Sequence, residues 1–119
     1  MKNQPRIDKD GTKIWYKNEK AHRENGPAII YPEGTEFWCI NGKLHRDDGP
    51  AATYADGSQA WYKHDKLHRD DGPAIIYPNG NHSWYKDDIM YIPTAHELMA
   101  WKMKNRENKQ HTKQHENLQ

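Results

Sequence analysis

Short apolar segments alternate with turn residues along most of the chain. One kind of segment carries a Trp, as in residues 14–16, and the other follows a Gly-Pro pair, as in residues 28–31. Both kinds are rich in β-branched and aromatic residues and are too short for helices, so they indicate strands. Turn dipeptides such as Asp56-Gly57 and Asn79-Gly80 separate them. The pattern predicts a mainly β fold, an antiparallel meander of about seven or eight strands over residues 7–92.

The segments belong to a repeat of 23 residues that runs without insertion through three and a half copies. A period of this length indicates an array of identical supersecondary units, here one β-hairpin per unit in a single repeat domain over residues 1–93. Members of the repeat are Gly11, Gly34, Gly57 and Gly80, Trp15, Trp38, Trp61 and Trp84, His22, His45 and His68, and Arg23, Arg46 and Arg69.

The pattern changes after Pro93. Residues 94–97, Thr-Ala-His-Glu, form a capping box, which predicts a C-terminal α-helix over residues 94–107. The polar, Gln-rich residues 108–119 are expected to form a disordered tail. Trp101 has two interpretations: it covers the open end of the sheet, as terminal caps of repeat arrays do, or it docks into a partner.

Side chains alternate across a strand, so each Trp and the residue after it lie on opposite faces. Since large apolar groups are few, we expect the Trp row to form the structural core and the Tyr row to be the exposed, partner-binding set. The core prediction covers Trp15, Trp38, Trp61 and Trp84, and the exposed prediction covers Tyr16, Tyr62 and Tyr85.

Composition narrows the class of protein. Hydrophobic residues make up 34% of the 119-residue chain, and 18 Lys and Arg face 17 Asp and Glu. This balance argues against a wholly basic nucleic-acid coat. We expect no membrane span and no secretory signal, because no apolar run is long enough, and therefore a cytoplasmic location.

The constant 23-residue spacing also limits which metal or catalytic sites the repeated residues can form. Equivalent residues lie two strands apart, about 10 Å, so His22, His45 and His68 cannot share one metal ion, and each is expected to anchor its own turn. The row Arg23, Arg46 and Arg69 either pairs with neighbouring acids at the turns or contacts an acidic or phosphate-bearing partner. We expect no catalytic residue, no metal and no cofactor, since a catalytic site needs one asymmetric constellation.

One unit resembles a known repeat. Residues 38–45, Trp-Cys-Ile-Asn-Gly-Lys-Leu-His, followed by Gly49, Tyr54 and Asp56-Gly57, are similar to the MORN repeat. The resemblance implies one β-hairpin per copy of about 23 residues and a binding scaffold for proteins or lipids. The His-Arg-acid-acid-Gly-Pro-Ala variety looks like the kind encoded by phages and large DNA viruses, which would place the protein in the host cytoplasm.

These observations favour a non-catalytic scaffold that binds a macromolecule, first of all a protein. If the viral resemblance holds, an inhibitor of a host defence complex with an anti-CRISPR-like role is the specific hypothesis. The alternative is a nucleic-acid-binding protein that uses the Arg row, the aromatic side chains and the basic tail. A homodimer is also possible, because open sheet edges associate. Partner contacts are assigned to Arg23, Arg46, Arg69, Tyr16, Tyr62, Tyr85 and Trp101.

Overall fold

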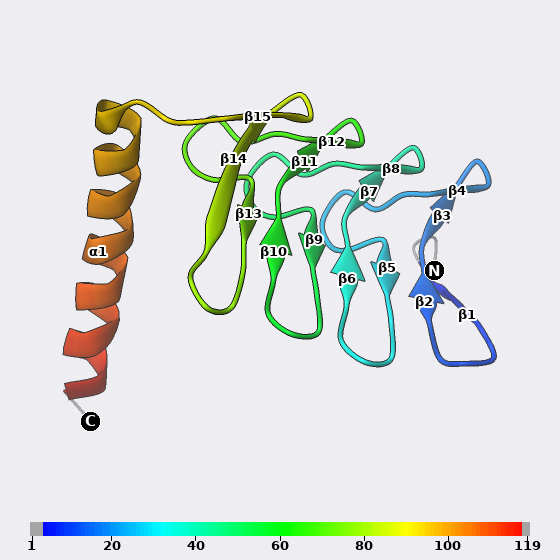
Figure 1. The fold of residues 1–119 in the computed structure, drawn as a ribbon. Helices are drawn as coiled ribbons and strands as arrows, with labels where there is room; N and C mark the ends of the chain where they lie inside the picture. Colours follow the sequence, from blue (N-terminus) through cyan, green and yellow to red (C-terminus); the bar gives the residue numbers. More distant parts are fainter. Residues whose placement is uncertain (1–3, 118–119) are drawn as a thin grey trace.

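The computed structural model describes residues 4–117, and it describes the side chains of residues 4–106. Four units, each containing one Trp of the repeat, follow one another in sequence order, and a single helix stands beside the last (Figure 1). The fold is mainly β and antiparallel, as the sequence predicts. The thinnest dimension of the molecule is 23 Å.

The main sheet has nine strands in the order β1-β2-β5-β6-β9-β10-β13-β14-β15. Its register is regular, since Phe37 pairs with Ile29 on one side and with Ala52 on the other. The strands are β1 (Arg6–Ile7), β2 (Lys13–Ile14), β5 (Ile29–Ile30), β6 (Glu36–Phe37), β9 (Ala52–Thr53), β10 (Gln59–Ala60), β13 (Ile75–Ile76), β14 (His82–Lys86) and β15 (Ile89–Tyr91).

Three small hairpins form a second row along one end of the main sheet (Figure 1). Each unit therefore contains two hairpins, where the sequence analysis expected one, and the expected count of strands was too low. The small hairpins pair β3 (Tyr16–Lys17) with β4 (Lys20–Ala21), β7 (Cys39–Ile40) with β8 (Lys43–Leu44), and β11 (Tyr62–Lys63) with β12 (Lys66–Leu67).

The Trp of each of the first three units is the point at which the chain leaves the main sheet. The Trp38 N–H donates to Ala51 O in the main sheet at 2.7 Å, while Trp38 O accepts from the N–H of His45 in the small hairpin at 3.0 Å. Trp15 and Trp61 make the same two bonds. One predicted strand is thus divided at its Trp into two short strands that belong to different sheets.

Each small hairpin turns through two residues with positive φ, the geometry of a type I′ turn. Asn41 and Gly42 occupy this turn in the second unit, with φ of 51° and 81°. In the third unit His64 and Asp65 take the same conformation, although neither is glycine. A positive φ disfavours most side chains, although His and Asp adopt it more readily than most. Without a glycine, the sequence signals this turn only weakly outside the second unit.

The fully buried core consists mainly of small side chains. Ala28, Ala51 and Ala74, which follow the Gly-Pro pairs, have no exposed surface. Trp84 is buried at 4% exposure, but Trp15, Trp38 and Trp61 are only half-buried. The prediction that all four Trp form the core is therefore right for the last unit and incomplete for the first three, because a single-layer sheet offers no second layer to cover them.

Helix α1 (Ala95–Asn117) follows the last strand. Its capping box forms as predicted: Glu97 N–H donates to Thr94 Oγ1 at 3.1 Å, and Thr94 N–H donates to Glu97 Oε1 at 2.9 Å. The helix continues past residue 107, the end expected from the sequence, because residues 108–117 contain no Gly or Pro that would stop it. Of the residues expected to form a disordered tail, 108–117 are helical, and residues 118–119 lie outside the described residues. No helix within the described part is long and apolar enough to cross a membrane.

Trp101 attaches α1 to the end of the sheet. Its ring centre lies 6.1 Å from that of Trp84, edge to face, and 4.8 Å from that of His82. A methyl group on Gly72 would lie 2.9 Å from Trp101 Cδ1, so the backbone there approaches the ring closely. Of its two interpretations, the structure supports Trp101 as the cap of the array, so this face of the ring is not a free partner contact.

Because Trp84 is buried by Trp101 and Tyr91, we predict that Trp84→Ala lowers the free energy of unfolding by about 3–5 kcal/mol. Trp61→Ala removes the same side chain from a half-buried position and should cost less. Urea unfolding followed by far-ultraviolet circular dichroism measures both. A cost for Trp61→Ala equal to or above that for Trp84→Ala would contradict the assignment of the core.

Candidate functional site

The Arg and Trp residues of the first three units stack in pairs. Each guanidinium carbon lies 3.8–3.9 Å from the centre of a Trp ring, a cation–π contact. Each guanidinium also donates from Nη1 to a proline carbonyl at 3.0–3.2 Å. The pairs, here called the Arg–Trp row, are Arg23 with Trp15, Arg46 with Trp38, and Arg69 with Trp61.

A glycine lies against the other face of each guanidinium. A methyl group on Gly49 would lie 2.7 Å from Arg46 Cζ, and Gly26 and Gly72 approach their arginines in the same way. These glycines do not have positive φ. The Gly of the Gly-Pro pair is therefore needed for close approach, and the guanidinium is held in a slot between a Trp ring and the backbone.

The row of His residues joins neighbouring units. His45 Nδ1 accepts the backbone N–H of His64, in the next unit's turn, at 3.1 Å, and its Nε2 lies 3.0 Å from Asp47 Oδ1. Because Nδ1 accepts, the ring proton is assigned to Nε2, which donates to the carboxylate. His22 and His68 repeat both contacts. This confirms that the imidazoles anchor turns, and it adds that the turn belongs partly to the following unit.

The second acid of each corner pairs with the arginine. Arg46 Nε donates to Asp48 Oδ1 and Arg69 Nε to Asp71 Oδ1, both at 3.1 Å. Burial alone would raise the pKa of Asp71, but the hydrogen bond and charge of Arg69 outweigh it and leave the pKa below its ordinary value. The prediction that the arginines pair with acids at the turns is thus confirmed in units two and three. A contact of these arginines with a partner remains a prediction.

Three hollows lie in succession along the Arg–Trp row, with volumes of about 570, 510 and 540 Å³. Neighbouring hollows share walls, since the first two have Arg23 and Glu24 in common. The second and third share Arg46, Asp47 and Asp48. Together they form a groove lined by stacked aromatic and charged side chains.

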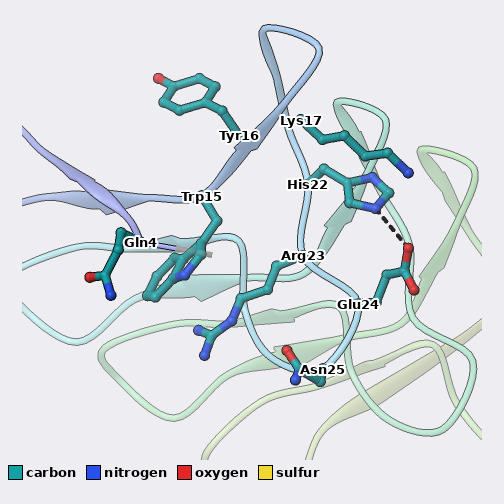
Figure 2. Close-up of a pocket in the computed structure, with 8 residues that line it drawn as sticks. All are labelled: Gln4, Trp15, Tyr16, Lys17, His22, Arg23, Glu24 and Asn25. Atoms are coloured by element: carbon teal, nitrogen blue, oxygen red, sulfur yellow. Dashed lines mark hydrogen bonds and ion pairs between the residues drawn. The ribbon is translucent and has the colours of Figure 1, made fainter. Parts of the chain in front are cut away.

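The first hollow differs in charge from the other two. Lys17 and Arg23 line it together with one carboxylate, Glu24, which turns toward His22 (Figure 2). In the second hollow two arginines face three carboxylates, and in the third three cations face four. The first hollow therefore has an excess of positive charge, and the others an excess of negative charge.

Of the three tyrosines predicted to be exposed, Tyr16 is exposed and the other two are half-buried. Tyr16 is 41% exposed and lies under Arg6, whose guanidinium carbon is 4.6 Å from the ring centre. Tyr62 and Tyr85 are half-buried, and burial raises the pKa of Tyr62. The structure brings the predicted Tyr16 and Arg23 together in the first hollow and leaves Tyr62 and Tyr85 outside the three hollows.

A second aromatic row occupies one face of the main sheet. Tyr31 and Tyr54 stack edge to face on the two sides of Phe37, with ring centres 5.6 and 5.9 Å apart. Tyr54 is 38% exposed and Tyr77, its equivalent in the next unit, is 45% exposed. We call Tyr31, Phe37, Tyr54 and Tyr77 the tyrosine face. The signal was present in the sequence, because the three tyrosines recur every 23 residues, but they were assigned only to strands.

Further apolar side chains are exposed at the helix end of the array. Ile89 is 71% exposed, Met90 63% and Ile92 93%. They stand where an array with another complete unit would carry buried or polar residues, so they mark the point at which the repeat stops. Sequence analysis did not single them out.

Cys39 lies in the small hairpin of the second unit and is 4% exposed. Burial, with a smaller contribution from Asp65, raises the pKa of its thiol to about 11. Because the thiolate is the nucleophile, this environment suits a packed side chain and opposes covalent chemistry.

We predict that iodoacetamide at pH 8 alkylates Cys39 in the folded protein at least about 100-fold more slowly than in the urea-unfolded chain. The raised pKa also links stability to pH. The folded state keeps the thiol proton that the unfolded chain loses near pH 8.5, so stability is fully present below that pH and falls as pH rises toward about 11. Equal alkylation rates in the two states would contradict this environment.

Comparison with protein-family models, with curated proteins and with solved structures gave no match. The resemblance to MORN repeats therefore stays a prediction from the sequence. The function has to be argued from the surface of the chain.

Proposed function

We propose that the chain is a non-catalytic scaffold that binds a protein partner through the tyrosine face. The observation that carries this proposal is the exposure of Tyr54 and Tyr77 on a single-layer sheet. Tyrosine is enriched in protein interfaces and among the residues that dominate binding energy.

The sequence of the repeat explains why this face is open. The position of Phe37 is taken by Ala60 one unit later and by Ser83 in the last unit. Tyr31 therefore has an aromatic neighbour, whereas near Tyr77 the residue Ile75 pairs with the small side chains Ala60 and Ser83. The tyrosine face thus becomes more exposed toward the helix end, where Ile89 and Met90 are exposed as well.

Binding suits the chain better than catalysis because its reactive groups serve the repeat. The His, Arg and Asp side chains of the corners bond to one another and to turn backbones in successive units. A group held this way in each copy supports the array, and no single copy is set apart as a reaction centre.

The specific form of the proposal is an inhibitor of a host defence complex. It is supported by the resemblance of the repeat to those encoded by phages and large DNA viruses. It is also supported by the small size of the chain, whose corner side chains bond to one another. The test is to assay a purified defence nuclease with and without an equimolar amount of the protein. Inhibition of the nuclease supports the inhibitor proposal, and full nuclease activity contradicts it.

The nucleic-acid alternative has less support. Arg46 and Arg69, which would contact phosphates, already bind Asp48 and Asp71. These two paired arginines offer little charge to a polyanion, since counterion release needs unpaired cations.

We predict that Tyr54→Ser with Tyr77→Ser weakens binding to the partner by about tenfold or more. The partner is first captured from lysate with nuclease present and identified, and its affinity is then measured with purified proteins. Gln59→Ser is the matched control, because Gln59 belongs to the main sheet but lies on its opposite face. Unchanged affinity of the double variant would exclude the tyrosine face as the binding surface. Capture that is lost when nuclease is added would favour the nucleic-acid alternative.

A further inference from the structure

The first unit breaks the repeat at one charged position. Asp48 and Asp71, which accept from the Nε of Arg46 and Arg69, are equivalent to Asn25 in the first unit. An amide presents no negative charge, so the first unit lacks the carboxylate that closes the arginine slot in the two units that follow.

Arg23 is nevertheless held like the other arginines. Its guanidinium carbon lies 3.8 Å from the centre of Trp15, its Nη1 donates to Pro27 O at 3.2 Å, and Gly26 backs it. Among the side chains of residues 4–106, none supplies a carboxylate within 4.0 Å of the Arg23 nitrogens. The Nε edge of a positioned guanidinium therefore faces the hollow without the partner that its equivalents have.

The surroundings of that edge suit an anion. Gln4 and Asn25 line the hollow and offer amide donors, and Glu24 turns away toward His22 (Figure 2). Lys17 adds a second positive charge to the hollow, with its side chain beside His22 and not beside the Arg23 guanidinium. The hollow measures about 570 Å³, enough for a side chain to enter. The rings of Trp15 and Tyr16 line it as well.

We propose that the first hollow binds a carboxylate of an Asp or Glu side chain in an acidic segment of the protein partner, with Arg23 as the main contact. The molecule supplies the template, since Asp48 on Arg46 shows that a carboxylate fits this slot. A planar guanidinium edge matches a planar carboxylate better than a tetrahedral phosphate matches this single slot. The site extends the proposed function by naming the chemistry of the partner, and it lies apart from the tyrosine face.

The test is a titration of ¹⁵N-labelled full-length protein with a hexaglutamate peptide at low salt, followed through the arginine Nε–H resonances. We expect the Arg23 resonance to shift progressively, while those of Arg46 and Arg69 hold, because Asp48 and Asp71 already occupy their edges. Hexaglutamine is the uncharged control and should leave all three in place.

Two variants make the test specific. Asn25→Asp should rebuild the internal pair and weaken hexaglutamate binding by about tenfold or more, and it should fold, because two units already carry Asp there. Asp48→Asn is its mirror image, and it should make the Arg46 resonance respond to the peptide.

Unaltered hexaglutamate affinity in Asn25→Asp would overturn the proposal, as would an Arg23 resonance that stays still at saturating peptide. A larger and tighter response to oligodeoxythymidine than to hexaglutamate would overturn it in favour of a phosphate ligand. Because the peptide replaces the partner, these results do not depend on the tyrosine face. Loss of peptide binding with intact partner capture would separate this proposal from the proposed function.

Discussion

The array depends on one interaction, the stacking of an arginine on the Trp at which the chain bends in each of the first three units. A single-layer sheet has no second layer to cover its large side chains. The guanidinium covers the Trp ring, and the glycine behind it lets the backbone close over both. The same cation then binds a corner acid and a proline carbonyl, so one side chain fixes the ring, the turn and the chain direction.

The last unit shows what happens when that arginine is missing. Ile92 stands at the position that Arg69 has one unit earlier, and Tyr91 at that of His68. Trp101 of α1 then takes over and covers Trp84 from outside the repeat. Helix α1 thus substitutes for a side chain of the repeat, and the side chains left without a following unit, such as Ile92, become exposed.

The period, the strand positions, the turn at Asp56-Gly57 and the capping box at Thr94 could all be predicted, because each depends on local residue chemistry. The small hairpins could not, since His64 and Asp65 form a turn of positive φ without a glycine and so signal it only weakly. Likewise, the slot for Arg46 depends on contacts between Trp38 and Gly49 that are formed by folding. The first hollow could not be predicted for a related reason. The Asn25 at the position of Asp48 removes the partner of an arginine, and this is visible only after the structure shows that Arg46 and Asp48 form a pair.

A double-mutant cycle between Arg46 and Trp38 tests the central claim most directly. The free energy of unfolding is measured for the wild type, Arg46→Met, Trp38→Leu and the double variant. If the stack holds the unit together, the two substitutions are coupled by about 1–2 kcal/mol in favour of the native pair. Additive costs, with a coupling energy near zero, would mean that the two side chains stabilise the array independently and would contradict the account.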